Sequence, residues 1–85
     1  MASLKEKVEK ALTDSASGII DPVVELEQTS SYKVGGLVIS NTFLDMDQLD
    51  RQNKIWNYLE RVLQQEELLN IVSLITVTPD EADIH

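Results

Sequence analysis

The sequence predicts an α+β fold in which helices cover one face of a three-stranded β-sheet. Residues 3–14 and 47–68 repeat apolar side chains every three or four positions, which is the spacing of an amphipathic helix. Residues 22–27 instead alternate apolar and acidic side chains, whereas residues 32–40 and 71–77 are rich in apolar and β-branched residues. In chain order these segments give α-β-β-α-β, with one further short helix in the middle as an alternative.

The first helix is expected over residues 3–14 because Leu4, Val8 and Leu12 fall on one helical face. Ser3 can cap its start, and Glu6 stands at the position that completes a capping box. A small-residue stretch that includes Gly18 ends it.

The two strands that follow are expected to form an antiparallel hairpin. Pro22 opens the first strand, and the polar run Gln28-Thr29-Ser30-Ser31 predicts the turn. The pair Gly35-Gly36 lies inside the second strand, where glycine predicts a bulge or a close approach of another backbone.

A connector over residues 41–47 has Phe43 as its one large apolar anchor, and a long helix is expected to follow over residues 47–68. Residues 45–52 could alternatively form a separate short helix. The acidic first turn suits the positive end of the helix dipole. The apolar face of the helix is predicted to consist of Leu49, Ile55, Trp56, Leu59, Val62 and Leu63.

The last strand, residues 71–77, leads into Thr78-Pro79-Asp80-Glu81, which has the residue types that open a helix. If this strand pairs parallel with an earlier one, the long helix forms a right-handed crossover.

Composition limits the function classes. The chain has 85 residues, which is enough for a single domain over residues 1–85, and it has no cysteine. Seven basic residues against fifteen acidic ones give a net charge of −8, which disfavours binding to nucleic-acid phosphates or anionic lipid. No apolar stretch is long enough for a membrane helix and no leader pattern is evident, so the expected location is the cytoplasm.

Several strings in this order resemble the BolA family. They are Leu37-Val38-Ile39-Ser40 followed by Phe43, residues 49–55, and residues 71–77 followed by Thr78-Pro79-Asp80-Glu81; together the likeness covers about residues 20–82. The resemblance implies the α-β-β-α-α-β arrangement, similar to class II KH domains. It also implies a monothiol glutaredoxin as partner and a shared [2Fe-2S] cluster used in iron handling, and for some members a role in transcription and cell morphology.

The sequence departs from the family where the cluster would be held. Gln52 stands at the family's helix histidine, Asn70 at the histidine before the last strand, and the turn at 28–31 offers neither Cys nor His; residues 64–69 look like a small insertion. Iron in such clusters prefers thiolate or imidazole ligands. We therefore expect no metal site and no cofactor.

Four residues are candidates for contact with a partner: Arg51, Gln52, Lys54 and Asn70. The alternative for Arg51 is an ion pair with an acid on its own helix, Asp47 or Asp50, of which Asp47 has the i,i+4 spacing. On the same helix, Trp56 is expected in the core and Tyr58 at its edge.

No catalytic residues are predicted, because His85, the only histidine, is the last residue and no nucleophile–base pair is evident. Acidic residues around position 47 are interpreted as a solvated helix start.

The preferred function is a non-enzymatic, BolA-like protein-binding regulator related to glutaredoxin-partnered iron and redox handling. The alternative is a KH-like nucleic-acid-binding or transcriptional regulator that uses a stripe of Arg51, Lys54 and Arg61. A homodimer formed by strand pairing also stays open.

Overall fold

The computed structural model describes residues 3–29 and 32–83, so His85 and the middle of the predicted hairpin turn lie outside the described residues. The chain forms six main elements and a short last helix, in the order α-β-β-α-α-β-α. They are α1 (Leu4–Thr13), β1 (Val23–Gln28), β2 (Val34–Ile39), α2 (Gln48–Val62), α3 (Gln65–Leu69), β3 (Ile71–Val77) and α4 (Pro79–Ala82), with 3-10 turns at Ser15–Ser17 and Asn41–Phe43. This order confirms the predicted α-β-β-α-α-β arrangement.

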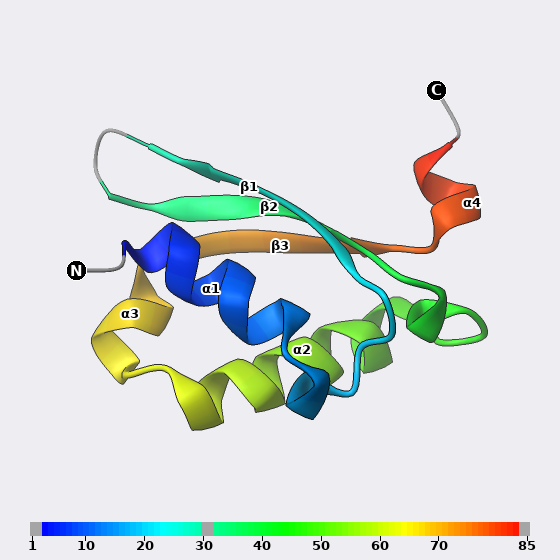
Figure 1. Cartoon of the computed structure of the whole chain (residues 1–85), viewed down its shortest axis with the longest axis horizontal. Coiled ribbons are helices and arrows are strands. Elements are labelled where there is room, and N and C mark those ends of the chain that lie inside the picture. The colour runs from blue at the N-terminus through cyan, green and yellow to red at the C-terminus, as the bar shows by residue number, and fades with distance from the viewer. Residues whose placement is uncertain (1–2, 30–31, 84–85) are drawn as a thin grey trace.

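The three strands form one mixed sheet in the order β1-β2-β3 (Figure 1). β1 and β2 pair antiparallel, from Val23 opposite Ile39 to Gln28 opposite Val34, so the predicted hairpin is confirmed. β3 returns after the helices and pairs parallel with β2. The middle strand β2 therefore lies between two edge strands.

The glycine pair predicted a bulge or a close backbone approach, and a register shift and a close approach both occur there. The β2–β3 register shifts between Val34 and Gly35, which pair with Ile71 and Ser73, so the extra residue is Val72 on β3. A methyl group on Gly36 would overlap the carbonyl oxygen of Glu25 and would lie 2.9 Å from Leu26 Cα. The backbone of β1 therefore leaves no room for a side chain at Gly36.

The predicted single helix over residues 47–68 is wrong. α2 ends at Val62, and Leu63 takes an extended conformation (φ −113°, ψ 155°) that turns its side chain against the core. Gln64 and Glu67 then form a capping box that starts α3. Burial of Leu63 and the new cap outweigh continuation of the helix, and the alternative break around residues 45–52 does not occur within α2.

The predicted apolar face of the long helix is also partly wrong. Leu49 and Val62 are exposed, whereas Arg51 and Tyr58 are buried. The buried face is rotated because α2 packs against β3 as well as α1, and the polar side chains at the β3 edge need partners. Trp56, which was expected in the core, is only partly buried and packs against its edge, whereas Tyr58, which was expected at the edge, is buried.

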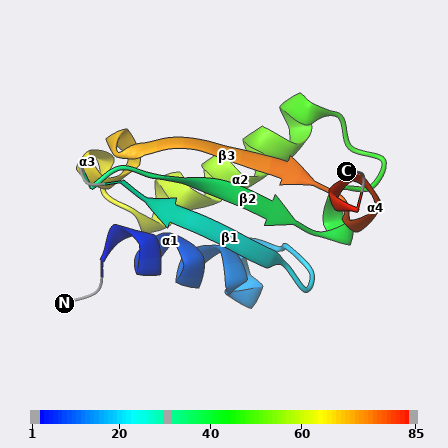
Figure 2. The same cartoon turned by 90° about the horizontal axis from the view of Figure 1, so that it is seen from above.

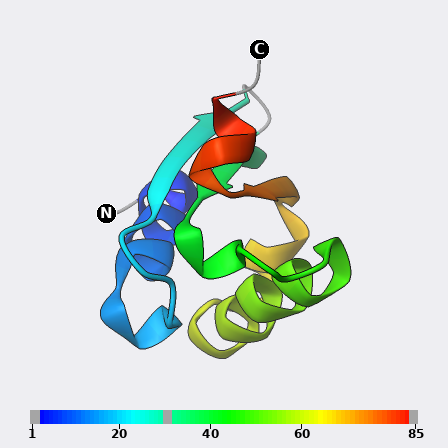
Figure 3. The same ribbon diagram turned by 90° about the vertical axis from the view of Figure 1, so that its right-hand side faces the viewer.

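The core lies between the sheet and the two longer helices. α1 and α2 lie on one face of the sheet, as Figures 1 and 3 show from two directions, and α1 packs against β1 and α2 against β3. Phe43 is fully buried and anchors the connector before α2, as predicted. The fully or nearly buried apolar side chains are Val8, Leu12, Ile19, Leu26, Val34, Val38, Phe43, Ile55, Leu59, Ile71 and Leu74.

The opposite face of the sheet is open along most of its length. Of the helices in the described residues, only α4 lies on that side, at the end of the sheet where β3 stops (Figures 1 and 2). β3 is apolar on both faces, but Val72 and Ile75 point away from the helices and stay exposed. This unequal coverage defines the two surfaces on which a site can be built.

Candidate functional site

The side chain of Gln52 is fully engaged inside the protein. Its Nε2 donates to the carbonyl oxygen of Leu74 at 2.8 Å and to Thr76 Oγ1 at 3.3 Å. Its Oε1 accepts from Trp56 Nε1 at 3.0 Å. An amide has two donor hydrogens and one acceptor oxygen, so these bonds use its donors and leave little capacity for an external ligand.

Arg51 is buried, with 6% of its surface exposed, and it binds three different segments. Nε donates to the carbonyl oxygen of Met46 at 2.9 Å, and Nη1 donates to the carbonyl oxygen of Thr76 at 3.3 Å. Nη1 also forms an ion pair with Glu81 Oε1 at 2.7 Å. The expected pairing with Asp47 or Asp50 is therefore wrong, because Asp47 instead caps α2 through Asp50 N and Arg51 turns toward β3.

Together these side chains form a polar clasp over the free edge of β3. We define the clasp as Gln48, Arg51, Gln52 and Thr76, since Thr76 Oγ1 also donates to Gln48 Oε1 at 3.2 Å. The carbonyl groups of Leu74 and Thr76 point to the same side of the strand, and both accept hydrogen bonds from side chains of α2. Pairing of a second copy along this edge would have to displace the clasp.

Glu81 closes the clasp from α4. Its Oε1 accepts from Thr78 N at 2.7 Å as well as from Arg51, so one carboxylate caps α4 and pairs with α2. The backbone hydrogen bond from Thr78, followed by the hydrogen bond from Arg51, holds the pKa of Glu81 below its ordinary value. Sequence reasoning missed Glu81 as the partner of Arg51, since thirty residues separate them.

Asn70 has a different environment. It ends α3, where its Nδ2 donates to the carbonyl oxygen of Glu66 at 3.2 Å, and its own carbonyl oxygen accepts from Val34 N at 2.8 Å. Asn70 precedes β3, whereas Gln52 bonds to Leu74, four residues along the chain. At about 3.3 Å per strand residue, this displaces the two by roughly 13 Å along β3.

The proposed basic stripe does not form on α2. Arg51 is buried, whereas Lys54 lies against Gly18, where a methyl group would be 3.3 Å from Lys54 Nζ. Arg61 lies over the ring of Tyr58, with 6.0 Å from Cζ to the ring centroid. Of the candidate residues, the structure thus brings Arg51 and Gln52 together and leaves Lys54 and Asn70 apart from them.

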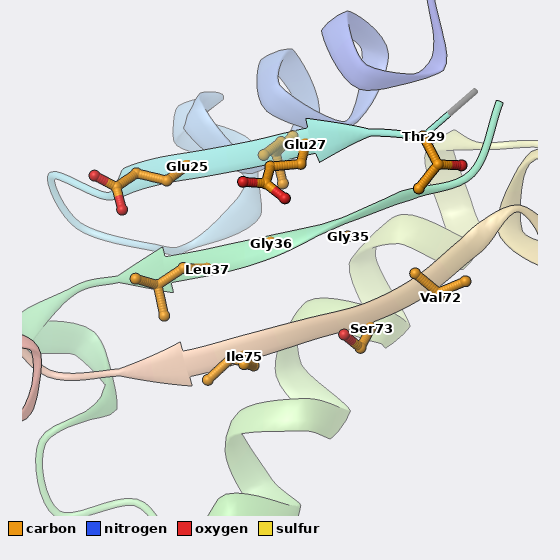
Figure 4. Close-up of a pocket in the computed structure, with 10 residues that line it drawn as sticks. Glu25, Glu27, Thr29, Gly35, Gly36, Leu37, Val72, Ser73 and Ile75 are labelled. Atoms are coloured by element: carbon orange, nitrogen blue, oxygen red, sulfur yellow. The ribbon is translucent and has the colours of Figure 1, made fainter. Parts of the chain in front are cut away.

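The open face of the sheet carries a shallow depression that sequence reasoning did not single out (Figure 4). Glu25 and Glu27 border it on β1, Leu37 lies on β2, and Ser73 and Ile75 border it on β3, as Figure 4 shows. The alternation of valine and leucine with glutamate in β1 already placed the two acids on the solvent side. The other signal in the sequence was β3, which is apolar at every position except Ser73 and Thr76 and therefore presents apolar residues on both faces of the sheet.

Neither surface has the donor set of a metal centre. Within residues 3–29 and 32–83, no three His, Cys, Asp or Glu side chains group together as a metal site would need. In the same ranges, no helix has the length and apolar character to cross a membrane. What the open face offers is exposed apolar and acidic surface, and what the clasp offers is internal hydrogen bonding.

Comparisons with known proteins identify the fold. No family model matches the sequence, and no curated protein matches it either. Among solved structures, BolA1 from Arabidopsis thaliana superposes with a TM-score of 0.62 over 95% of this chain and 98% of that one, at 15% sequence identity. With its α-β-β-α-α-β order and mixed three-stranded sheet, the chain has a BolA-like fold.

Proposed function

We propose that this protein is a non-enzymatic, protein-binding module with a BolA-like fold, and that a monothiol glutaredoxin is the first partner to test. In this role the protein is a regulator in iron or redox handling that contributes no cluster ligand of its own. The partner and the pathway come from the resemblance of the sequence to the BolA family.

The observation that carries the proposal is the open face of the sheet. Val72 and Ile75 are 61% and 58% exposed there, and Val23 on β1 is 53% exposed. A sheet face of this kind normally packs against another layer, and exposed apolar clusters with a polar border are typical of protein interaction sites. A protein partner would supply the missing layer.

The cluster part of the family role does not fit these residues. Gln52 presents an amide in place of an imidazole, and that amide is bound to Leu74 and Trp56. Asn70 presents a second amide that bonds within α3. Since iron clusters prefer sulfur or imidazole donors, these two amides do not suit cluster ligation.

The nucleic-acid alternative has weaker support. It needed Arg51, Lys54 and Arg61 along one surface of α2, and Arg51 is inside the protein. With a net charge of −8, the remaining exposed cations give little attraction for a phosphate backbone.

Isothermal titration calorimetry with a monothiol glutaredoxin tests the proposal. We expect binding to both the apo and the cluster-loaded glutaredoxin, with dissociation constants within about threefold of each other, because this chain supplies no ligand. The Gln52→Met variant should bind like the wild type. Absence of heat with either form would remove glutaredoxin as the partner, and cluster-dependent binding that is lost in Gln52→Met would contradict the non-ligand role.

A further inference from the structure

We infer that the open sheet face docks a basic amphipathic α-helix of the partner protein, with its apolar stripe over Leu37 and Ile75 and its lysine or arginine side chains over Glu25 and Glu27. This inference rests on the proposed function and names the surface and the partner chemistry. The helix would form a third layer, on the side of the sheet that α1 and α2 leave open (Figure 3).

The register of the strands arranges this face in cross-strand rows, two of which line the depression. One row is Glu25, Leu37 and Ile75, and the next toward the hairpin is Glu27, Gly35 and Ser73. Acids therefore lie along β1, and apolar and small side chains lie along β2 and β3 (Figure 4). A helix laid across the sheet would meet one charged border and one apolar floor.

Gly35 gives the depression its depth. It is the residue of the second row that has no side chain, and a methyl group there would lie 3.1 Å from Val72 Cγ2 and 3.3 Å from the carbonyl oxygen of Ser73. A methyl group at Gly35 would thus already be in tight contact with β3, and the row has no side chain of its own between Glu27 and Ser73. A leucine or isoleucine of the partner helix would lie over this row and contact Val72 and Ile75, which are apolar and line the depression.

The charge distribution selects a basic partner. Glu25 and Glu27 are exposed, and within the described ranges the structure records no ion pair for either of them. Of the seven basic residues, only Lys33 lies on the hairpin, and the others are on the helices that cover the opposite face. Those six are Lys5, Lys7, Lys10, Arg51, Lys54 and Arg61.

The acidic character extends to the end of the sheet. α4, on the open side, carries Asp80 and is followed by Asp83, both exposed. An acidic partner helix, or a second copy of a chain with a net charge of −8, would be repelled from this face. Complementary charge is expected to set the orientation and the association rate of a basic helix.

The test uses a synthetic amphipathic helical peptide of about 18 residues, long enough to span the strands, with a leucine stripe flanked by lysines. NMR titration of the ¹⁵N-labelled full chain should shift the amide signals of β1, β2 and β3 at the open-face positions. The same peptide with glutamates in place of lysines should not bind.

Two double variants separate a specific site from general attraction. Glu25→Lys with Glu27→Lys reverses the charge of the two acids on the open face. Glu9→Lys with Glu60→Lys reverses the charge of two exposed acids on α1 and α2. Each pair adds four positive charge units and moves the net charge from −8 to −4. We expect the first pair to weaken peptide binding about fivefold or more, and the second pair to change it less than about twofold. Ile75→Thr should also weaken binding, because it removes exposed apolar surface while keeping a strand-forming residue.

Three outcomes would overturn the inference. They are equal weakening by the two charge pairs, peptide-induced shifts confined to α1 and α2, and concentration-dependent shifts of the open-face amides without peptide, which would indicate a second copy as the occupant. The proposed function fails separately. If glutaredoxin binds and Glu25→Lys with Glu27→Lys leaves that binding unchanged, the proposed docking surface is wrong but the proposed protein-binding function holds. If only the peptide binds, the docking surface holds and glutaredoxin is the wrong partner.

Discussion

Arg51 Nη1 on α2 lies 2.7 Å from Glu81 Oε1 on α4, and the same carboxylate oxygen accepts the hydrogen bond that caps α4. This single oxygen links the crossover helix to the last helix across the end of β3. The guanidinium also holds the carbonyl oxygens of Met46 and Thr76. The position of α4 on the open side of the sheet therefore depends on a side chain that comes from the covered side.

Replacing Arg51 with methionine should lower the free energy of unfolding by about 2–4 kcal/mol, because two buried carbonyl groups lose their donors while the apolar stem is kept. Urea denaturation followed by circular dichroism measures this change. Arg61→Met is the matched control, since Arg61 is exposed and lies over the Tyr58 ring, and it should change stability by less than about 0.5 kcal/mol. Equal effects of the two variants would contradict the structural role of Arg51.

Stability should fall in acid through Glu81. The backbone hydrogen bond from Thr78 and the ion pair with Arg51 hold its pKa below the ordinary value of 4.5. A carboxyl with a lowered folded pKa stabilises the protein above its unfolded pKa, and this contribution is lost as the pH falls below about 4.5 and through the folded pKa. Glu67 should contribute to the loss of stability in acid in the same way, because hydrogen bonds from Lys7 and from the backbone of Gln64 lower its pKa.

Unfolding at several pH values between about 2.5 and 7 measures this effect. Glu81→Gln should be less stable than the wild type near neutral pH, and the difference between the two should shrink in acid. NMR titration of the Glu81 side-chain carbon should give a midpoint below 4.5. A midpoint at or above that value would contradict the proposed hydrogen bonding.

Much of the fold follows from local patterns in the sequence. The alternation through β1, the glycine pair in β2 and the Thr78-Pro79 helix start each depend on neighbouring residues, and the structure contains all three features. The break between α2 and α3 could not be derived in this way. It depends on Leu63 packing against a core that only the folded chain assembles.

The candidate site was harder to predict because its contacts join distant residues. Gln52 and Arg51 were identified from the resemblance of residues 49–55 to the BolA helix signature, yet their partners Leu74 and Glu81 are 22 and 30 residues away. Periodicity placed Glu25 and Glu27 on the solvent side of β1, but it does not show that no helix covers that side. The open face is a property of the assembled layers.

The two adjacent glycines should respond differently to substitution by alanine. Gly36→Ala places a methyl group against the carbonyl oxygen of Glu25 and 2.9 Å from Leu26 Cα, and backbone atoms cannot move aside easily. We expect a loss of about 2–4 kcal/mol in the free energy of unfolding. Gly35→Ala meets Val72 Cγ2 at 3.1 Å and the carbonyl oxygen of Ser73 at 3.3 Å, and shifts of a few tenths of an ångström relieve both contacts, so its cost should be less than about 1 kcal/mol. Thermal or urea unfolding of both variants tests this order, and a reversed order would contradict the strand register.

The polar clasp at the β3 edge predicts that two glutamines of α2 differ in how well they tolerate substitution by glutamate. Gln52 must donate to the carbonyl oxygen of Leu74, whereas Gln48 only accepts a hydrogen bond from Thr76. A carboxylate can accept but cannot donate. Gln52→Glu should therefore cost about 1–3 kcal/mol at neutral pH, whereas Gln48→Glu should be nearly neutral and is also favoured by its place in the first helical turn.

Fluorescence reports the same change locally, because Trp56 is the only tryptophan and its Nε1 donates to Gln52 Oε1. A carboxylate at position 52 should turn away from the carbonyl oxygen of Leu74, which changes its hydrogen bond with the Trp56 indole. The tryptophan emission wavelength of folded Gln52→Glu should therefore shift, whereas that of Gln48→Glu should not. Protonation lets a glutamic acid donate again, so the stability difference between Gln52→Glu and the wild type should narrow in acid. Equal stability of the two glutamate variants at neutral pH would show that Gln52 does not hold the β3 edge, and position 52 would again be open to a ligand role.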